Sequence, residues 1–107
     1  MIELSEIRVF LCTIPTKMNY SFDTLMGLAQ QIFDEDPLSG HLFLFVNRER
    51  DRLKILFWDH DGLAIFYKRI DRGAFQFPRA SETAVEISRD ELLRLLSGMR
   101  VAERRSA

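Results

Sequence analysis

Apolar runs and polar turns follow one another through the centre of the chain, from Asp36 to Pro78. Three apolar runs separated by two polar turns predict antiparallel strands, at His41–Val46, Leu53–Trp58 and Leu63–Ile70. The charged segment Asn47–Arg52 is predicted to be a hairpin loop. Asp59–Gly62 is predicted to be a tight turn, in which Asp61-Gly62 supplies the positive-φ residues that such turns favour.

The flanking segments predict two helices and shorter strands. Helical spacing of apolar residues predicts a helix over Ser21–Phe33, and a Ser88–Glu91 capping box predicts a second helix that ends at Gly98. Short strands are predicted at Ile7–Thr13, Ala74–Phe77 and Ala84–Ile87. The predicted fold class is α+β: a single domain over residues 1–99, in which one helix packs on a curled antiparallel meander and a C-terminal helix follows. Residues 100–107 are expected to form a frayed tail.

Pairing parity separates the meander into two faces. If Val46 lies opposite Leu53 and Trp58 opposite Leu63, side chains alternate between the faces. The first face is aliphatic and holds Leu42, Leu44, Val46, Leu53, Ile55, Phe57, Ala64, Phe66 and Lys68. The second mixes rings with cations and holds His41, Phe43, Phe45, Lys54, Leu56, Trp58, Leu63, Ile65, Tyr67 and Arg69. We expect the first helix on the aliphatic face, with one core shared by Leu25, Leu28, Ile32, Ile55, Phe57 and Phe66.

Charge is uneven along the chain although the formal net charge is −1. Residues 41–80 hold eight bases against five acids (+3), residues 1–40 hold two against six (−4), and residues 81–107 hold five of each. A site for a polyanion is therefore expected on the central meander. The candidate DNA contacts are Arg48, Arg50, Arg52, Lys54, Lys68, Arg69, Arg72 and Arg79.

Each candidate group on the meander has a structural and a binding interpretation. Trp58 and Tyr67 are candidate partner-binding rings that stack on bases or dock on a protein. Alternatively a helix or a partner subunit covers this face, which we favour because Phe43, Phe45 and Leu56 require burial. The hairpin arginines alternate with Glu49 and Asp51, which favours a solvated tip over a nucleic-acid arm. Both interpretations stay open for Lys68, Arg69, Arg72 and Arg79.

No catalytic set or cofactor motif is present in the sequence. Asp59-His60-Asp61 has metal-ligand residue types, but a tight turn points consecutive side chains apart, so we expect no metal there. His41 has no nucleophile or second carboxylate to complete a site. Cys12 is expected to be a buried small hydrophobe. With no phosphate-binding Gly-rich loop, the chain is predicted to be a non-enzyme without cofactors. It has no membrane-length apolar run and no recognisable signal peptide, so we expect a cytoplasmic protein.

Several motifs together resemble one family. Asp36-Pro37-Leu38-Ser39-Gly40-His41-Leu42-Phe43-Leu44-Phe45 is similar to the DPxSGHLFxF signature of the accessory proteins (TnpB) encoded by bacterial insertion sequence 66 elements. The matching motifs that follow are Asp51-Arg52-Leu53-Lys54-Ile55-Leu56, Trp58-Asp59-His60-Asp61-Gly62, Tyr67-Lys68-Arg69, Arg72-Gly73-Ala74-Phe75, Phe77-Pro78, Ile87-Ser88, Glu91-Leu92 and Leu95-Leu96-Ser97-Gly98. The resemblance covers nearly the whole chain.

This resemblance implies an accessory factor for transposition. It would bind element DNA, the separate transposase that carries the catalytic carboxylates, or both. The alternative is a pure protein–protein adaptor or oligomerisation module without DNA contact, with a second copy of itself as a further candidate partner. One segment departs from the family pattern: where members carry a basic MRKGFDGL-like stretch, this chain has Met18-Asn19-Tyr20-Ser21-Phe22-Asp23-Thr24-Leu25.

Overall fold

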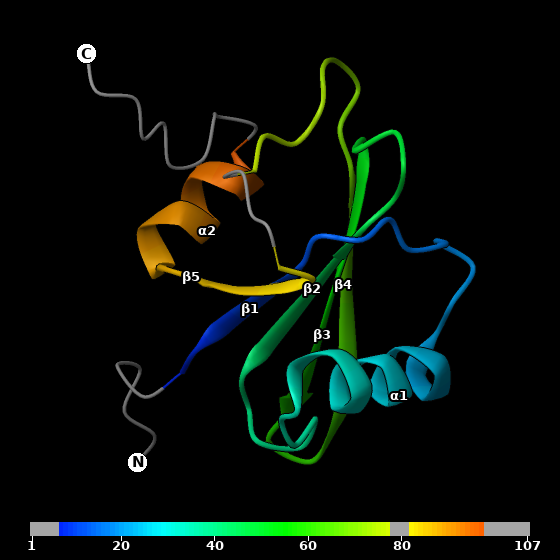
Figure 1. Cartoon of the computed structure of the whole chain (residues 1–107), viewed down its shortest axis with the longest axis vertical. Helices are drawn as coiled ribbons and strands as arrows, with labels where there is room; N and C mark the ends of the chain where they lie inside the picture. Colours follow the sequence, from blue (N-terminus) through cyan, green and yellow to red (C-terminus); the bar gives the residue numbers. More distant parts are fainter. Residues whose placement is uncertain (1–6, 78–81, 98–107) are drawn as a thin grey trace.

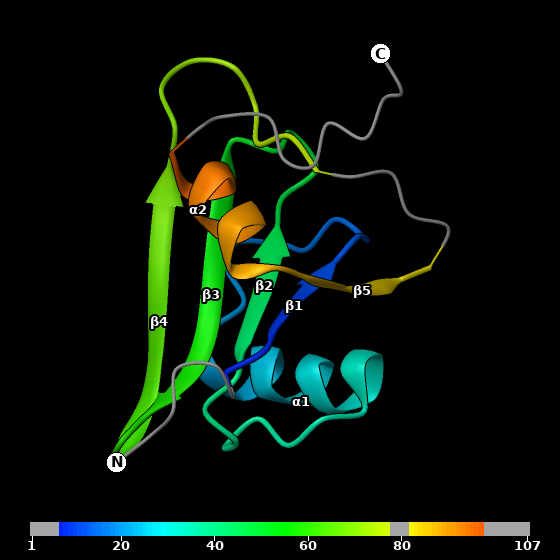
Figure 2. The same cartoon turned by 90° about the vertical axis from the view of Figure 1, so that its left-hand side faces the viewer.

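Five strands form one mixed sheet in the computed structural model, which describes residues 7–77 and 82–97. The strands are β1 (Val9–Cys12), β2 (Leu42–Val46), β3 (Arg52–Asp59), β4 (Gly62–Arg69) and β5 (Ala84–Ile87). Their order across the sheet is β4-β3-β2-β1-β5, with β4 at an outer edge (Figure 2). β1 and β2 pair in parallel and every other pair is antiparallel. The predicted α+β domain is confirmed, with a mixed sheet in which the predicted meander forms β2 to β4.

The register of the meander is the one that the alternation predicts. Val46 lies opposite Leu53, and Trp58 lies opposite Leu63. A register shift of one residue would turn the whole apolar set of a strand to the other face. The division of the meander into an aliphatic and an aromatic face is therefore correct.

The two helices cover opposite faces of the sheet (Figure 1). Helix α1 (Phe22–Phe33) connects the parallel strands β1 and β2 and packs on the aromatic face. Its buried partners there are Phe10, Cys12, Phe43, Phe45 and Leu56. Helix α2 (Arg89–Leu96) packs on the aliphatic face, where its Leu92 and Leu95 join a core of Val9, Leu11, Leu44, Val46, Leu53, Ile55, Phe75 and Ile87.

The expectation that the first helix packs on the aliphatic face is wrong. Leu25 and Ile32 belong to the aromatic-face core, whereas Ile55 belongs to the aliphatic-face core on the other side of the sheet. Phe57 is half-buried, and Phe66 is 44% exposed. The reason lies in the connection between β1 and β2: a parallel pair requires a crossover, and here the crossover helix lies over the aromatic rings. The pattern of β2 to β4 contains no information about that long-range pairing.

The capping box predicted at the start of the second helix is confirmed. The Ser88 hydroxyl accepts from the Glu91 N–H at 3.0 Å, and the Glu91 carboxylate accepts from the Ser88 N–H at 2.8 Å. α2 ends at Leu96, and Gly98 lies outside the described residues.

Ala74–Phe77 is not a strand, since Gln76 alone within it makes a strand-like bridge. No helix in the described ranges combines the length and apolarity needed to cross a bilayer.

Candidate nucleic-acid interface

Four side chains from two neighbouring strands meet at one end of the sheet, where β3 begins and β4 ends. Arg52 lies directly opposite Arg69, and Lys54 lies directly opposite Tyr67. Alternation along each strand places all four on the aromatic side of the sheet. The sequence placed Lys54, Tyr67 and Arg69 on one face and assigned Arg52 to the hairpin loop. The structure brings Arg52 to the other three and shows that the four have different environments.

Lys54 is buried and bonded within the protein. The residue is 8% exposed, its ammonium donates to the Tyr20 carbonyl oxygen at 2.7 Å, and the ammonium lies 4.9 Å from the centroid of the Tyr67 ring. A charge this deeply shielded is stable only when it is paired or hydrogen-bonded. Lys54 therefore tethers the 13–20 loop to β3 and is shielded from solvent, whereas the sequence suggested a surface cation at this position.

Lys68 faces the opposite side of the sheet, under α2. Its ammonium donates to the carbonyl oxygen of Leu96, the last residue of that helix. Cations are favourable at a helix C-terminus because they satisfy free carbonyls and oppose the negative end of the dipole. Lys68 is thus held in the fold away from Arg69, its neighbour in sequence.

Asn47 organises the hairpin loop between β2 and β3. Its amide oxygen accepts from the N–H groups of Asp51 and Arg52 at 3.1 and 3.0 Å. Its amide nitrogen donates to the carboxylates of Asp51 and Glu49 at 2.7 and 3.3 Å. The two acids of the loop therefore bond to Asn47. Arg48 and Arg50 are exposed, and the Arg50 guanidinium lies 5.6 Å from the Phe77 ring centroid.

Two hollows flank Arg52 at this end of the molecule. The first, of about 520 Å³, is lined by Arg52, Tyr67, Arg69 and Asp71. The second, of about 420 Å³, is lined by Pro15, Thr16, Lys17, Met18, Asn19, Asn47, Arg48, Glu49 and Arg52. Arg52 lines both hollows.

Lys17 belongs to this surface although sequence reasoning did not select it. The Thr16 N–H donates to the Val46 carbonyl oxygen at 2.8 Å, which holds the 13–20 loop against the end of β2. No local pattern signals this contact, because the two residues are thirty positions apart in the chain. The sequence shows that residue 17 is basic, but it does not show where this residue lies in the fold.

We define the basic end as Lys17, Arg48, Arg50, Arg52, Arg69 and Arg72. The 70–75 loop joins it because the Ile70 and Phe75 N–H groups donate to the carbonyl oxygens of Asp51 and Arg50. The same segments carry three carboxylates, Glu49, Asp51 and Asp71, which leaves an excess of three positive charges. Within residues 7–77 and 82–97, no carboxylate lies within ion-pair distance of any of these six cations. Arg79 lies outside the described residues.

Trp58 and Tyr67, the two predicted partner-binding rings, lie at different ends of the ladder. Trp58 is half-buried opposite Leu63, whereas Tyr67 is 50% exposed and four residues farther along β4. At about 3.3 Å per residue this separates them by roughly 13 Å. The structure therefore places Tyr67 beside the basic end and Trp58 beside the turn at 60–61.

That turn differs from the predicted one in the residue that adopts a positive φ. His60 adopts φ 63°, so it is His60, and not the predicted Asp61-Gly62, that supplies the positive φ. The Asp61 N–H donates to the Asp59 carbonyl oxygen at 2.5 Å, which closes the turn. In the part of the chain that the structure describes, no three His, Cys, Asp or Glu side chains are grouped so that they could hold an ion.

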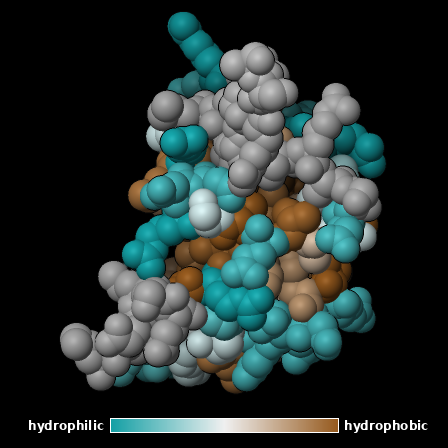
Figure 3. Space-filling view, turned by 60° about the vertical axis from the view of Figure 1, so that its left-hand side comes forward, coloured by the Kyte–Doolittle hydropathy of each residue, from teal (hydrophilic) through white to brown (hydrophobic). Residues whose placement is uncertain are grey.

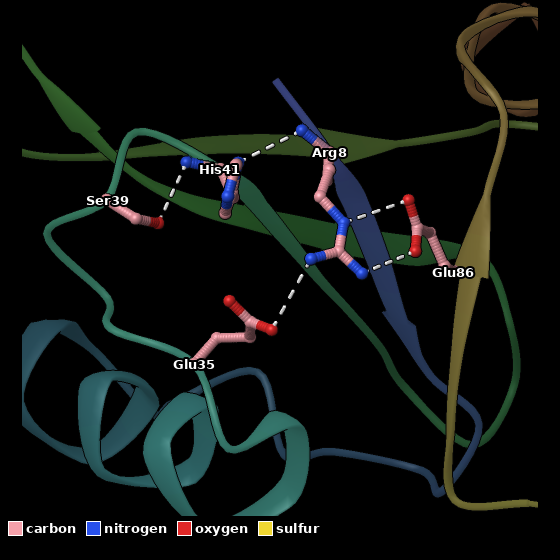
Figure 4. A network of polar contacts seen from close by, with 5 residues as sticks. All are labelled: Arg8, Glu35, Ser39, His41 and Glu86. Atoms are coloured by element: carbon pink, nitrogen blue, oxygen red, sulfur yellow. Dashed lines mark hydrogen bonds and ion pairs between the residues drawn. The ribbon is translucent and has the colours of Figure 1, made fainter. Parts of the chain in front are cut away.

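A second polar network holds the opposite end of the sheet (Figure 4). The Arg8 guanidinium donates to both Glu86 carboxylate oxygens at 3.1 and 2.8 Å, and a Glu35 oxygen lies 3.7 Å from it. These hydrogen bonds hold the pKa of Glu86 below its usual value. His41 Nδ1 accepts from the Arg8 backbone N–H at 3.0 Å, so this imidazole ties β1 to the start of β2.

The Asp36–His41 segment forms the loop that positions this imidazole. The Asp36 carboxylate accepts from the Leu38 N–H at 2.9 Å, and the Ser39 hydroxyl accepts from the His41 N–H at 3.2 Å. Gly40 adopts φ 93°, a conformation that other residues rarely adopt. Each polar residue of this sequence signature therefore has a structural role in a loop between α1 and β2.

Comparison with known proteins agrees with this signature. The IS66 Orf2 like protein family, TnpB_IS66, matches residues 7–106. The chain belongs to this family. Membership implies an accessory role in transposition. No solved structure gives a significant match.

Two relatives of this IS66 Orf2-like chain come from Sinorhizobium fredii (strain NBRC 101917 / NGR234). The uncharacterized protein y4hO is 39% identical over 94 residues, which are 88% of this chain and 82% of the relative. The uncharacterized protein y4jC is 28% identical over 93 residues, which are 87% of this chain and 80% of the relative.

The departure from the family pattern falls beside the basic end. Asn19 lines the second hollow together with Lys17, Arg48 and Arg52. Tyr20 is half-buried on the aromatic-face core, and its carbonyl oxygen accepts from Lys54. Of Asn19 and Tyr20, Asn19 is therefore the one at a position where a cation would add to the basic end.

Proposed function

We propose that this IS66 Orf2-like protein is a non-catalytic accessory factor that binds the DNA of its element through the basic end. One observation carries the proposal: six cations from three segments gather at one end of the sheet, with no compensating ion pair among the described residues. Such a surface suits the phosphate backbone, which dominates nucleic-acid affinity.

Electrostatics of the whole chain set the expected strength of binding. The formal net charge is −1, so the attraction depends on the local excess and not on the protein as a whole. Contacts to phosphates position a protein without reading sequence. We therefore infer weak, sequence-tolerant binding that is strongly sensitive to salt.

A duplex titration tests this proposal. With a labelled DNA duplex in low salt, fluorescence anisotropy should rise with a dissociation constant of about micromolar or weaker, and the affinity should fall steeply toward physiological salt. The Asn19→Arg variant should bind more tightly, because the new cation joins the second hollow beside Arg48. Absence of any anisotropy change at low salt, for both the natural chain and this variant, would remove the DNA proposal.

A protein–protein adaptor is the second candidate function, and β4 favours it. This strand is an outer edge of the sheet, and its Phe66 and Tyr67 are 44% and 50% exposed. Apolar side chains also gather on the side of the molecule that carries α2 (Figure 3). We infer that an extended segment of the transposase would pair with this edge, as peptides do in β-augmentation. Capture of the transposase that survives nuclease treatment would favour the adaptor, whereas loss on nuclease treatment would favour DNA.

A further inference from the structure

Arg52 and Arg69 form a like-charged pair across the β3–β4 ladder. They are directly opposite each other on the same side of the sheet. Side chains in such positions have Cβ atoms about 4.5–5.5 Å apart, and like charges there destabilise the sheet. The fold therefore places two arginines opposite each other at a free-energy cost, and both line the first hollow.

No ion pair in the described part of the chain offsets this repulsion. No carboxylate within residues 7–77 and 82–97 lies at ion-pair distance from either arginine. The Nε of Arg52 is shielded from solvent and has no acceptor there. Lys54, the third cation of the quartet, differs because the Tyr20 carbonyl and the Tyr67 ring already satisfy it. Among the three cations of this group, only the two arginines therefore lack an internal partner within the described ranges.

The first hollow gives an anion access to the pair. It measures about 520 Å³ and has Tyr67 and Asp71 as its other lining residues. The contact with Lys54 restrains the Tyr67 ring on one side of this hollow. Two guanidinium groups against the single Asp71 carboxylate leave the lining with a net positive charge. The forked donors of arginine match the oxygen geometry of phosphate, so this lining suits one phosphate group better than it suits a halide.

We propose that Arg52 and Arg69 form a clamp for a single phosphate group, with Tyr67 as its side wall. If the phosphate belongs to a DNA backbone, the clamp rests on the proposed function and names one contact through which the DNA binds. A free phosphate ion has the same chemistry and is the other source. Binding removes the repulsion between the two arginines, so a phosphate should stabilise the fold by mass action.

Thermal unfolding in inorganic phosphate tests the clamp. The melting temperature of the natural chain is measured over a phosphate series and over a chloride series of equal ionic strength. Arg69→Gln and Arg52→Gln each remove one guanidinium fork. Arg94→Gln on the exposed side of α2 removes the same charge away from the hollow and serves as the matched control.

The clamp predicts a phosphate-specific rise in melting temperature for the natural chain and for Arg94→Gln. Either hollow variant should need about 10- to 100-fold more phosphate for the same rise, because a charge-assisted hydrogen bond is lost. Without phosphate, Arg69→Gln should be at least as stable as the natural chain, because the like-charge repulsion is relieved. An equal phosphate response in Arg69→Gln and the natural chain would overturn the clamp.

Duplex titration of the same variants separates the clamp from the proposed function. No phosphate response in a natural chain that still binds duplex would overturn the clamp and leave the DNA proposal standing. In a second outcome, the natural chain responds to phosphate but binds no duplex at low salt, and Arg69→Gln loses the phosphate response. This combination would support the clamp as a site for free phosphate. That result would overturn the DNA proposal.

Discussion

Replacing Phe43 with alanine is expected to lower the free energy of unfolding by about 3–5 kcal/mol, as aromatic core truncations do. Phe43 is fully buried, and its ring centroid lies 5.6 Å from that of Phe10 and 5.4 Å from that of Phe33. The change removes the contacts that this ring of β2 makes with Phe10 of β1 and with Phe33 of α1. Since a domain of this size is stable by about 5–15 kcal/mol, the variant loses a large share of its stability. Urea unfolding followed by circular dichroism measures the loss.

Phe66→Ala is the matched control for Phe43→Ala. It deletes the same atoms from β4, where the ring is 44% exposed on the α2 side of the sheet. We expect a loss of about 1 kcal/mol or less, as for surface substitutions. Equal losses at the two positions would contradict the arrangement in which α1 seals the aromatic face.

Reversing the charges of Arg69 and Arg72 together is expected to abolish duplex binding. Both residues belong to the basic end, and both are exposed. The Arg69→Glu and Arg72→Glu changes turn two attractive contacts with phosphates into two repulsive ones. The basic end then changes from an excess of three positive charges to a net negative charge. Anisotropy titration at low salt measures the loss, and far-ultraviolet circular dichroism verifies that the variant remains folded.

Reversal of Arg104 and Arg105 is the control with the same change in net charge. These residues lie in the C-terminal tail, outside the described part of the chain. We expect a smaller loss of affinity, because they are not among the six cations of the basic end. A loss equal to that of the Arg69 and Arg72 pair would mean that net charge alone governs binding, and the basic end would lose its special role.

The central meander could be predicted from sequence because its information is local. Strict alternation fixes which side chains share a face, and the turn lengths fix the pairing of Val46 with Leu53 and of Trp58 with Leu63. The capping box at Ser88 likewise depends on residues three positions apart. Such features need no knowledge of the rest of the chain.

The side of the sheet covered by α1 could not be predicted, because both faces of the meander are apolar. The choice follows from the parallel pairing of β1 with β2, which lie about thirty residues apart in the chain. Phe10 and Phe33 then complete an aromatic core with Phe43. Periodicity identifies the buried stripe of a helix but not the surface on which it packs.

The candidate site was only partly predictable because lysines and arginines look alike in a sequence. Lys54 and Lys68 are bound to the carbonyl oxygens of Tyr20 and Leu96, which are 34 and 28 positions away. Lys17 reaches the basic end through a loop contact with β2. Charge counting selected residues 41–80 as the candidate region, and tertiary hydrogen bonds decide which of the cations there stay available.

The salt dependence of duplex binding tests the central claim most directly. The logarithm of the association constant is plotted against the logarithm of the salt concentration for the natural chain and for Arg69→Gln. Our account predicts a straight line of negative slope for the natural chain, and a slope shallower by about 0.9 for the variant, because one phosphate contact is lost. A slope near zero for the natural chain, or identical slopes for the two proteins, would contradict it.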